Sequence, residues 1–345
     1  MASTVRLTLF SAMLTSGLLS AVAFADGAFS VSTPVPAEYA AGFASITEAD
    51  SESILRHLVE GEMAGRGTGQ EGYLKAAKWF ASQLEANGFQ PAGDNGSWYQ
   101  NVPFIKLTIH PESCGIAVNG EECVAGNAYG ISTYAGTYEG SLPVTFATLT
   151  KQPLEISDGE CAGRLLVVQA GRSFGADNEF VIKAKPACLL IVSDDGRVRD
   201  EAVNQSEQTP SSIPVALITR AAANALALKC GAAAEFFPEG EPSNNLMLAS
   251  SQSVDCKLSI EREAIDVPNV VGWYPGSDES IRHEHICIGA HLDHLGKQRG
   301  ELYPGADDNG SGSTALLQIA KAIHTNPIKP KRSVLMIAFC AEERG

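Results

Sequence analysis

Apolar residues recur at helical spacing between Gln70 and Asn87. The apolar or small positions there are Ala76, Ala77, Phe80, Ala81 and Leu84. Steps of three and four residues place them on one face of a helix, and Gly88 follows where a helix ends. We therefore predict a helix over residues 70–87.

The segment GRGTG at 65–69 leads into this helix. A glycine-rich loop before a helix is able to bind an anion. This one lacks the Lys-Ser/Thr pair of a phosphate-binding loop, and no hydrophobic strand precedes it. We expect a structural turn.

Two apolar runs near the C-terminus, 285–290 and 333–340, flank the segment 312–325, which has helical periodicity. The expected apolar face of that helix carries Ala315, Leu316, Ile319, Ala320 and Ile323. Runs that are apolar throughout indicate strands buried on both faces, and two such strands joined by a helix predict a parallel βαβ unit. Ligand sites in such sheets lie beyond the carboxyl ends of the strands.

Residues 124–257 have a different texture. Short β-rich runs such as LPVTFATL, RLLVVQA, ACLLIVSD and IPVALITR alternate with clusters of Gly, Asp and Ser, which predicts a separate mixed α/β insertion. Residues 219–229 are expected to form a helix with Thr219 as its N-cap. The insertion contains no histidine, so we do not expect catalysis there.

The first 25 residues have the features of an export signal. Arg6 precedes a run of apolar and small residues that ends in Ala23-Phe24-Ala25, a pattern typical of signal-peptide cleavage. The run is just long enough to span a membrane, but its Ser/Thr content and its small residues at the cleavage position favour removal over a retained anchor. We expect a secreted or periplasmic protein with no stable membrane insertion after cleavage. An N-terminal arm at 26–45 would precede folding from Ile46.

Composition narrows the possible partners. A chain of 345 residues with 44% apolar content exceeds the usual size of one domain, so two folded units are expected. The net charge of -15 repels phosphate backbones, and no Lys/Arg cluster offsets it locally. We therefore expect no nucleic-acid partner. The acidity is interpreted as a solvated surface rather than as a preference for cationic substrates.

The chain has eight cysteines, which an exported protein is able to oxidise. Cys114 and Cys123 flank Asn119-Gly120, a strong hairpin signal, so a disulfide between them is plausible. Cys230 and Cys256 are a second possible pair. Two others, Cys287 and Cys340, lie in apolar runs and are expected to be small buried residues.

Candidate chemistry gathers after the two predicted C-terminal strands, in the segments GAHLDHLG (289–296), GADDNGSG (305–312) and FCAEERG (339–345). Imidazole nitrogen and carboxylate oxygen are ligands that zinc prefers. His291, Asp308 and Glu343 are candidate metal ligands, and the adjacent Glu342 is left unbound as a general base. Asp293 is placed to orient His291 through its second ring nitrogen. Each residue alone is more often structural; their joint placement favours a metal centre.

These motifs, together with GRGTGQEG and PNVVGWYPG, resemble the M28 family of zinc aminopeptidases and carboxypeptidases over residues 46–345. The resemblance implies an α/β fold of the phosphorylase/hydrolase type, with a mixed, largely parallel sheet flanked by helices. It also implies a smaller inserted protease-associated domain at 124–257. The peptidase domain would then comprise residues 46–123 and 258–345, after the signal (1–25) and the arm (26–45).

The resemblance also implies a pair of zinc ions and peptide or protein substrates. His291 would bind one zinc, Asp308 would bridge both, and Glu343 would bind the other. Glu342 would be the general base and Asp293 would orient His291. Asp307 is a weaker candidate for the bridging role.

The family uses two further ligands, an Asp and a His, from later segments, and the sequence ends before either. We therefore expect an incomplete peptidase domain and an inactive fragment of an aminopeptidase. A carboxypeptidase or dipeptidase of the same family is an alternative. A third possibility is a non-catalytic fragment that binds peptides or proteins. The oligomeric state cannot be inferred from the sequence.

Overall fold

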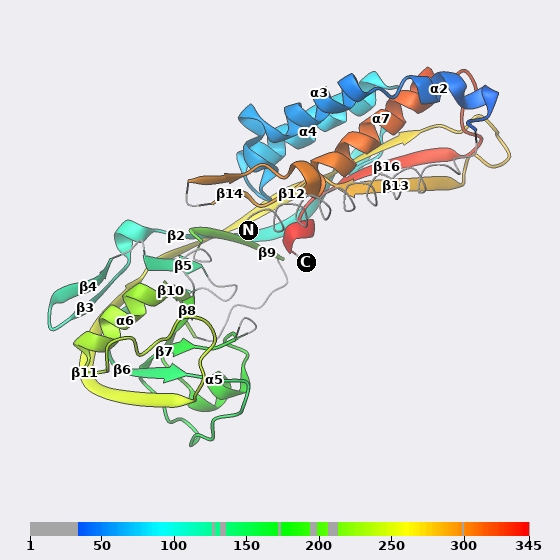
Figure 1. Ribbon diagram of the computed structural model, residues 1–345. Helices are drawn as coiled ribbons and strands as arrows, with labels where there is room; N and C mark the ends of the chain where they lie inside the picture. The colour runs from blue at the N-terminus through cyan, green and yellow to red at the C-terminus, as the bar shows by residue number, and fades with distance from the viewer. Residues whose placement is uncertain are drawn as a thin grey trace, which may run out of the picture.

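Two β-sheets organise the chain (Figure 1). The computed structural model describes residues 34–344 except 126, 127, 132–135, 172, 173, 194–198, 206–212 and 299. The expected signal segment, 1–25, lies outside the described residues. Among the described helices, none is long and apolar enough to cross a membrane.

The first sheet has the strand order β13-β16-β12-β2-β9, with the short β1 also paired to β12. Its strands are β1 (Gln90–Pro91), β2 (Tyr99–Ile109), β9 (Glu201–Gln205), β12 (Ile260–Tyr274), β13 (His285–His291) and β16 (Ser333–Phe339). A separate two-stranded sheet pairs β14 (Gly296–Gln298) with β15 (Glu301–Tyr303).

The expected mixed α/β class is confirmed, and so is the parallel pairing of β13 with β16. Parallel pairing extends less far than predicted. The described partners of β12 and β2 in this sheet are all antiparallel. The reason is the insertion: the chain leaves the sheet along β2 and returns along β12, so these two long strands run in opposite directions.

Helices cover one face of the first sheet (Figure 1). They are α3 (Glu48–Val59), α4 (Glu71–Ala86) and α7 (Ser311–Thr325), and the short α2 (Ala40–Ala44) packs on α7. The predicted helix over 70–87 is confirmed, and it ends at Asn87 before Gly88, whose φ is +74°. Tyr73, Phe80 and Leu84 of α4 are fully buried in one apolar cluster with strand residues. We call this sheet with its helices the first lobe.

Residues 37–44 belong to the first lobe, although the sequence predicts an arm at 26–45. They form a short 3-10 turn and α2. The buried Asn326, just after α7, accepts a hydrogen bond from the Gly42 N–H at 3.2 Å and donates to the Glu38 carbonyl at 3.2 Å. These contacts hold the segment on α7, which an apolar pattern does not reveal.

The buried face of α7 is rotated relative to the prediction. Ala315 is exposed, whereas Ser313 and Leu317 are buried beside Leu316 and Ala320. The Ser313 hydroxyl donates to the His291 carbonyl at 3.0 Å, so a polar contact with the strand end helps to set the orientation of the helix.

The second sheet has the order β4-β3-β11-β6-β7-β8-β10-β5. Its strands are β3 (Gly115–Val118), β4 (Glu121–Ala125), β5 (Tyr129–Ile131), β6 (Tyr138–Thr148), β7 (Leu165–Gln169), β8 (Cys188–Ser193), β10 (Val215–Thr219) and β11 (Leu246–Leu258). Its helices are α5 (Glu179–Ala184) and α6 (Arg220–Lys229). We call these elements the second lobe. The four predicted β-rich runs all form strands of this sheet, and Thr219 caps α6 as predicted by accepting from the Ala222 N–H.

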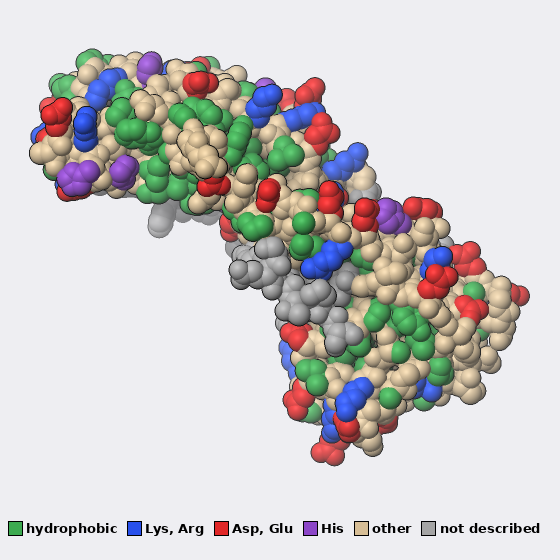
Figure 2. All heavy atoms as spheres, turned by 180° about the vertical axis from the view of Figure 1, so that it is seen from behind, with side chains coloured by type: hydrophobic (Ala, Val, Ile, Leu, Met, Phe, Trp, Pro, Cys, Tyr) green, Lys and Arg blue, Asp and Glu red, His purple; other side chains and the backbone are tan. Residues whose placement is uncertain are grey.

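The second lobe begins before the predicted boundary at 124, because the Asn119-Gly120 hairpin joins β3 to β4 inside this sheet. Strand β11 runs on through Ser259 into β12 and so connects the two lobes. Figure 2 shows both lobes from behind. Assignment of residues 124–257 to a protease-associated domain stays a prediction.

All eight cysteines are free thiols, so neither suggested disulfide is present. Cys123 instead points its thiol at the Ile116 carbonyl, 3.3 Å away. The prediction that Cys287 is buried is wrong, because β13 lies at the edge of its sheet and its side chains there are exposed. Cys340 is half-buried.

Candidate metal centre

The carboxyl ends of β13 and β16 meet, with His291 directly paired to Phe339. The loop that carries Asp308 (Ala306–Gly310) and the turn Glu342–Arg344 follow at the same end. The Nε2 atom of His291 lies 3.1 Å from Oδ1 of Asp308 and 3.9 Å from Oε2 of Glu342. Three residues that are distant in sequence are thus brought together as the strand pattern predicts.

His294 completes a second group, which the sequence reasoning missed. Its Nδ1 lies 2.6 Å from Oε1 of Glu343. The potential ligand atoms of His294, Asp308 and Glu343 all lie within 4.8 Å of one another. The available signal was the second histidine of GAHLDHLG, three residues after the first. Asp307, the weaker candidate, is exposed and does not belong to this group.

Asp293 is fully buried at the base of the site. Its Oδ2 accepts from the Thr68 hydroxyl at 2.7 Å, and its Oδ1 accepts from the Glu342 N–H at 3.1 Å. Burial raises the pKa of Asp293, and these two hydrogen bonds oppose that shift. The carboxylate therefore ties the GRGTG turn to the turn that holds Glu342 and Glu343.

The expected contact between Asp293 and His291 differs in detail. His291 Nδ1 lies 3.2 Å from the backbone carbonyl oxygen of Asp293 and 3.8 Å from its Oδ1. The carbonyl is therefore the nearer acceptor, because the carboxylate is already engaged by Thr68 and Glu342. A carbonyl accepts from a ring N–H as a carboxylate does, so it is equally able to fix the tautomer that leaves Nε2 free to bind a metal.

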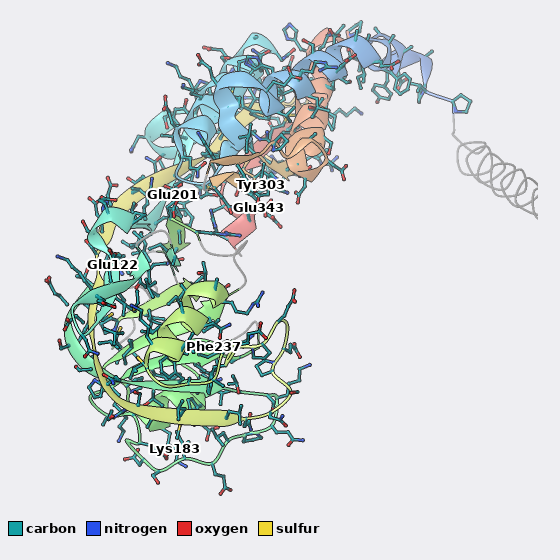
Figure 3. The ribbon with its side chains drawn as sticks, turned by 60° about the vertical axis from the view of Figure 1, so that its left-hand side comes forward. Glu122, Lys183, Glu201, Phe237, Tyr303 and Glu343 are labelled. Atoms are coloured by element: carbon teal, nitrogen blue, oxygen red, sulfur yellow. The ribbon has the colours of Figure 1, made fainter. Side chains whose placement is uncertain are left out.

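Exposure divides the site into two parts. The side chains of His291, His294 and Glu343 are 14%, 13% and 16% exposed, whereas those of Asp308 and Glu342 are 63% and 61% exposed. The two imidazoles are mostly buried, whereas the carboxylates of Asp308 and Glu342 face solvent. A solute is therefore able to reach the ligand atoms. Figure 3 shows Glu343 and Tyr303 on the first lobe, near its junction with the second.

The donor set fits zinc. It combines two imidazole nitrogens with carboxylate oxygens, the ligands of hydrolytic zinc sites. Ligand atoms about 2 Å from a shared ion lie within about 4 Å of one another, close to the spread found here. His294, Asp308 and Glu343 form one candidate metal position, and Nε2 of His291 lies beside it, 3.1 Å from Oδ1 of Asp308.

The GRGTG segment is a structural turn, as predicted. Gly65 has φ +71°, and a Cβ on it would come within 2.3 Å of the Tyr303 carbonyl oxygen. Gly67 forms a parallel bridge with His294. Only a residue without a side chain permits such close approach, so the turn lies directly against the loop that carries the histidines.

Comparison with known proteins supports this interpretation. Residues 269–345, which contain every candidate ligand, match the sequence model of Peptidase family M28. The uncharacterized protein YfbL of Escherichia coli (strain K12) is 36% identical over 78 residues. The resemblance to family M28 is thereby confirmed in the segment that holds the site.

Solved structures agree with the fold. The aminopeptidase from Aneurinibacillus sp. strain AM-1 superposes with a TM-score of 0.55 at 18% identity, over 90% of this chain and 66% of that one. BSAP, a zinc aminopeptidase from Bacillus subtilis, gives a TM-score of 0.50 at 16% identity, over 86% of this chain and 62% of its own.

The match to family M28 thus lies in residues 269–345, and the fold of the chain is shared with these two aminopeptidase structures. The chain covers 22% of the length of the E. coli relative and just under two thirds of the length of each aminopeptidase structure.

Proposed function

We propose that this chain carries the metal centre of an exported zinc peptidase that removes N-terminal residues from peptides. The observation that carries the proposal is the convergence of His291, Asp308 and Glu343, with His294, at one end of the β13–β16 pair. Export is supported by the N-terminal sequence pattern, and N-terminal specificity by the fold shared with aminopeptidases.

His291, Asp308 and Glu343 would hold a pair of zinc ions, with Asp308 between them. When bound, zinc polarises a carbonyl group and lowers the pKa of water. Glu342 is the general base: its exposed carboxylate accepts a proton from the attacking water and passes it to the leaving amine. Asp293 holds the backbone of Glu342 in place through the hydrogen bond to its N–H.

Replacement of Glu342 tests this assignment. In the full-length protein, Glu342→Gln should keep zinc bound and lower kcat by about 10²- to 10⁴-fold. The substitution removes the proton acceptor and leaves the metal ligands unchanged. Zinc content and hydrolysis of an aminoacyl p-nitroanilide are measured on the same samples. Glu112→Gln, on an exposed turn distant in sequence from the site, is the matched control. Near-normal turnover of Glu342→Gln would remove Glu342 from the role of base.

Substrate direction is tested separately. An aminopeptidase should cleave C-terminally blocked peptides and leave N-terminally blocked ones intact, since it needs a free amino terminus. Parallel assays with both peptide sets distinguish it from a carboxypeptidase, for which the preference is reversed.

A further inference from the structure

Arg66 is the largest fully buried side chain of the described residues, and it lies in the GRGTG turn beside the candidate metal centre. Its guanidinium donates only to backbone carbonyls among the contacts that the structure defines. Nε donates to Leu292 at 2.8 Å, and Nη1 donates to Leu58 at 2.6 Å and to Pro304 at 3.0 Å. Nη2 donates to Gly305 at 2.7 Å.

The Leu58 carbonyl belongs to α3, and the other three carbonyls come from the backbone that presents the ligands. Leu292 lies between His291 and Asp293 in the loop after β13. Pro304 and Gly305 begin the loop that carries Asp308. In addition, the Arg66 carbonyl accepts from the His294 N–H at 3.1 Å. One residue therefore contacts both loops that carry the candidate ligands.

An arginine suits this position better than any other residue. Its planar guanidinium has five N–H donors in a fixed fork, whereas a lysine ammonium is a compact point charge with three. Burial lowers the pKa of Arg66 to about 10, and the charges of Asp293 and Asp308 oppose that shift. The group stays protonated at neutral pH, so a buried cation has backbone carbonyls as its hydrogen-bond partners.

We propose that Arg66 is a positioning residue, which fixes the loop of His291 relative to the loop of Asp308 and so sets the separation of the metal ligands. The proposal rests on the function proposed above for these ligands. The hydrogen bonds of Arg66 in these loops go to the backbone of Leu292, Pro304 and Gly305, so it acts through the backbone next to the ligands.

Hydrogen–deuterium exchange of the chain without metal tests the proposal. Arg66→Lys should speed exchange about tenfold or more in peptides covering 289–298 and 303–312, while α4 and β12 keep their protection, because the hydrogen bonds of Arg66 go to the two loops and to Leu58 at the end of α3, and none goes to α4 or β12. Zinc affinity, measured by competition with a chelator, should fall about 10- to 100-fold, as expected when the support of metal ligands is lost.

Arg164 provides the matched control in the second lobe. It likewise bridges separate strands, with Nε donating to the Thr145 hydroxyl of β6 at 2.7 Å and Nη2 donating to the Ser250 carbonyl of β11 at 2.5 Å. Arg164→Lys should speed exchange in the second lobe and leave both ligand loops and the zinc affinity unchanged. A purely structural role for Arg66 predicts instead a rise spread over the whole first lobe, in proportion to its loss of stability.

Three results would overturn the proposal: unchanged exchange in both loops, a rise spread over the whole first lobe, or an Arg66→Lys chain that does not fold. The last contradicts it because local positioning leaves the core of the first lobe intact. The exchange result needs no zinc, so it is independent of whether the metal function holds. Failure of the unmodified chain to bind zinc would refute the proposed function and leave the exchange test standing.

Discussion

The two lobes use similar apolar strands in different ways. Strands β7 and β8 of the second lobe are buried almost throughout. Alternate residues belong to two apolar clusters, with Leu165 and Val167 in one, and Leu166 and Val168 in the other. In the first lobe β13 is similarly apolar, yet Ile286 is 50% exposed. An apolar run thus predicts a strand, but not whether both of its faces are covered.

The two lobes also differ in where their candidate metal-binding side chains lie. The second lobe is closed around apolar clusters, and the residues 124–257 contain no histidine. The first lobe gathers imidazoles and carboxylates where its parallel strands end. In the second lobe both faces of the sheet are covered, which suits a structural role. In the first lobe the ends of the parallel strands are open, which leaves room for a ligand.

Thiol reactivity should separate the lobes most sharply. Cys287 on β13 is exposed, whereas Cys188 and Cys256 in the second lobe are buried. A buried thiol reacts only after local or global opening, which costs up to the stability of the fold, so its labelling should be slower by about a thousandfold or more. Labelling with a coloured disulfide reagent, followed over time, measures this ratio.

Cys287→Ser provides the control for that experiment. It should remove the fastest labelling phase and leave the slow phases unchanged. Mass spectrometry assigns each phase to a cysteine, and fast labelling of Cys188 or Cys256 would show that the second lobe is more open than described.

The loss of unfolding free energy on truncating an isoleucine to alanine should also differ between the lobes. Ile218 on β10 is fully buried, and Ile286 on β13 is half exposed. Ile218→Ala should lower the free energy of unfolding by about 2–5 kcal/mol, because it removes packed methyl groups and leaves a cavity. Ile286→Ala should cost less than about 1 kcal/mol, since much of that side chain already meets water.

Urea unfolding of both variants checks this difference, with tryptophan fluorescence and circular dichroism followed together to separate the lobes. Equal losses of stability would mean that the outer face of β13 is covered in solution.

The smallest expected effect concerns an exposed ion pair in the first lobe, between Asp50 of α3 and Lys321 of α7. Hydrogen bonds from Lys321 and then Thr47 lower the pKa of Asp50. Because the folded-state pKa is depressed, the stabilisation is present above the pKa of the unfolded chain, about 3.9, and is lost as pH falls through the lower folded-state value.

Asp50→Asn should therefore lower the thermal midpoint slightly at pH 7, and the difference should vanish on acidification. Lys321→Gln should abolish most of the same pH dependence. A difference between Asp50→Asn and the unmodified chain that stays constant down to pH 3 would contradict the assignment.

Sequence reasoning reached the helices 70–87 and 219–229, the parallel strand pair and the joining of His291 with Asp308, because periodicity and strand ends are local features. It missed His294 as a partner of Glu343, since that contact depends on how the loop folds back. It also placed Ala315 in the core and Cys287 out of solvent, because neighbouring sequence does not reveal which face a distant segment covers.

The convergence of the ligands is most directly tested by zinc titration calorimetry of the chain. The unmodified chain should bind zinc, and His291→Ala should weaken binding by about tenfold or more, because one imidazole ligand is lost. His110→Ala, a histidine that pairs with Glu261 away from the site, should bind like the unmodified chain. Equal zinc affinity in all three proteins, or no binding by the unmodified chain, would contradict the metal centre.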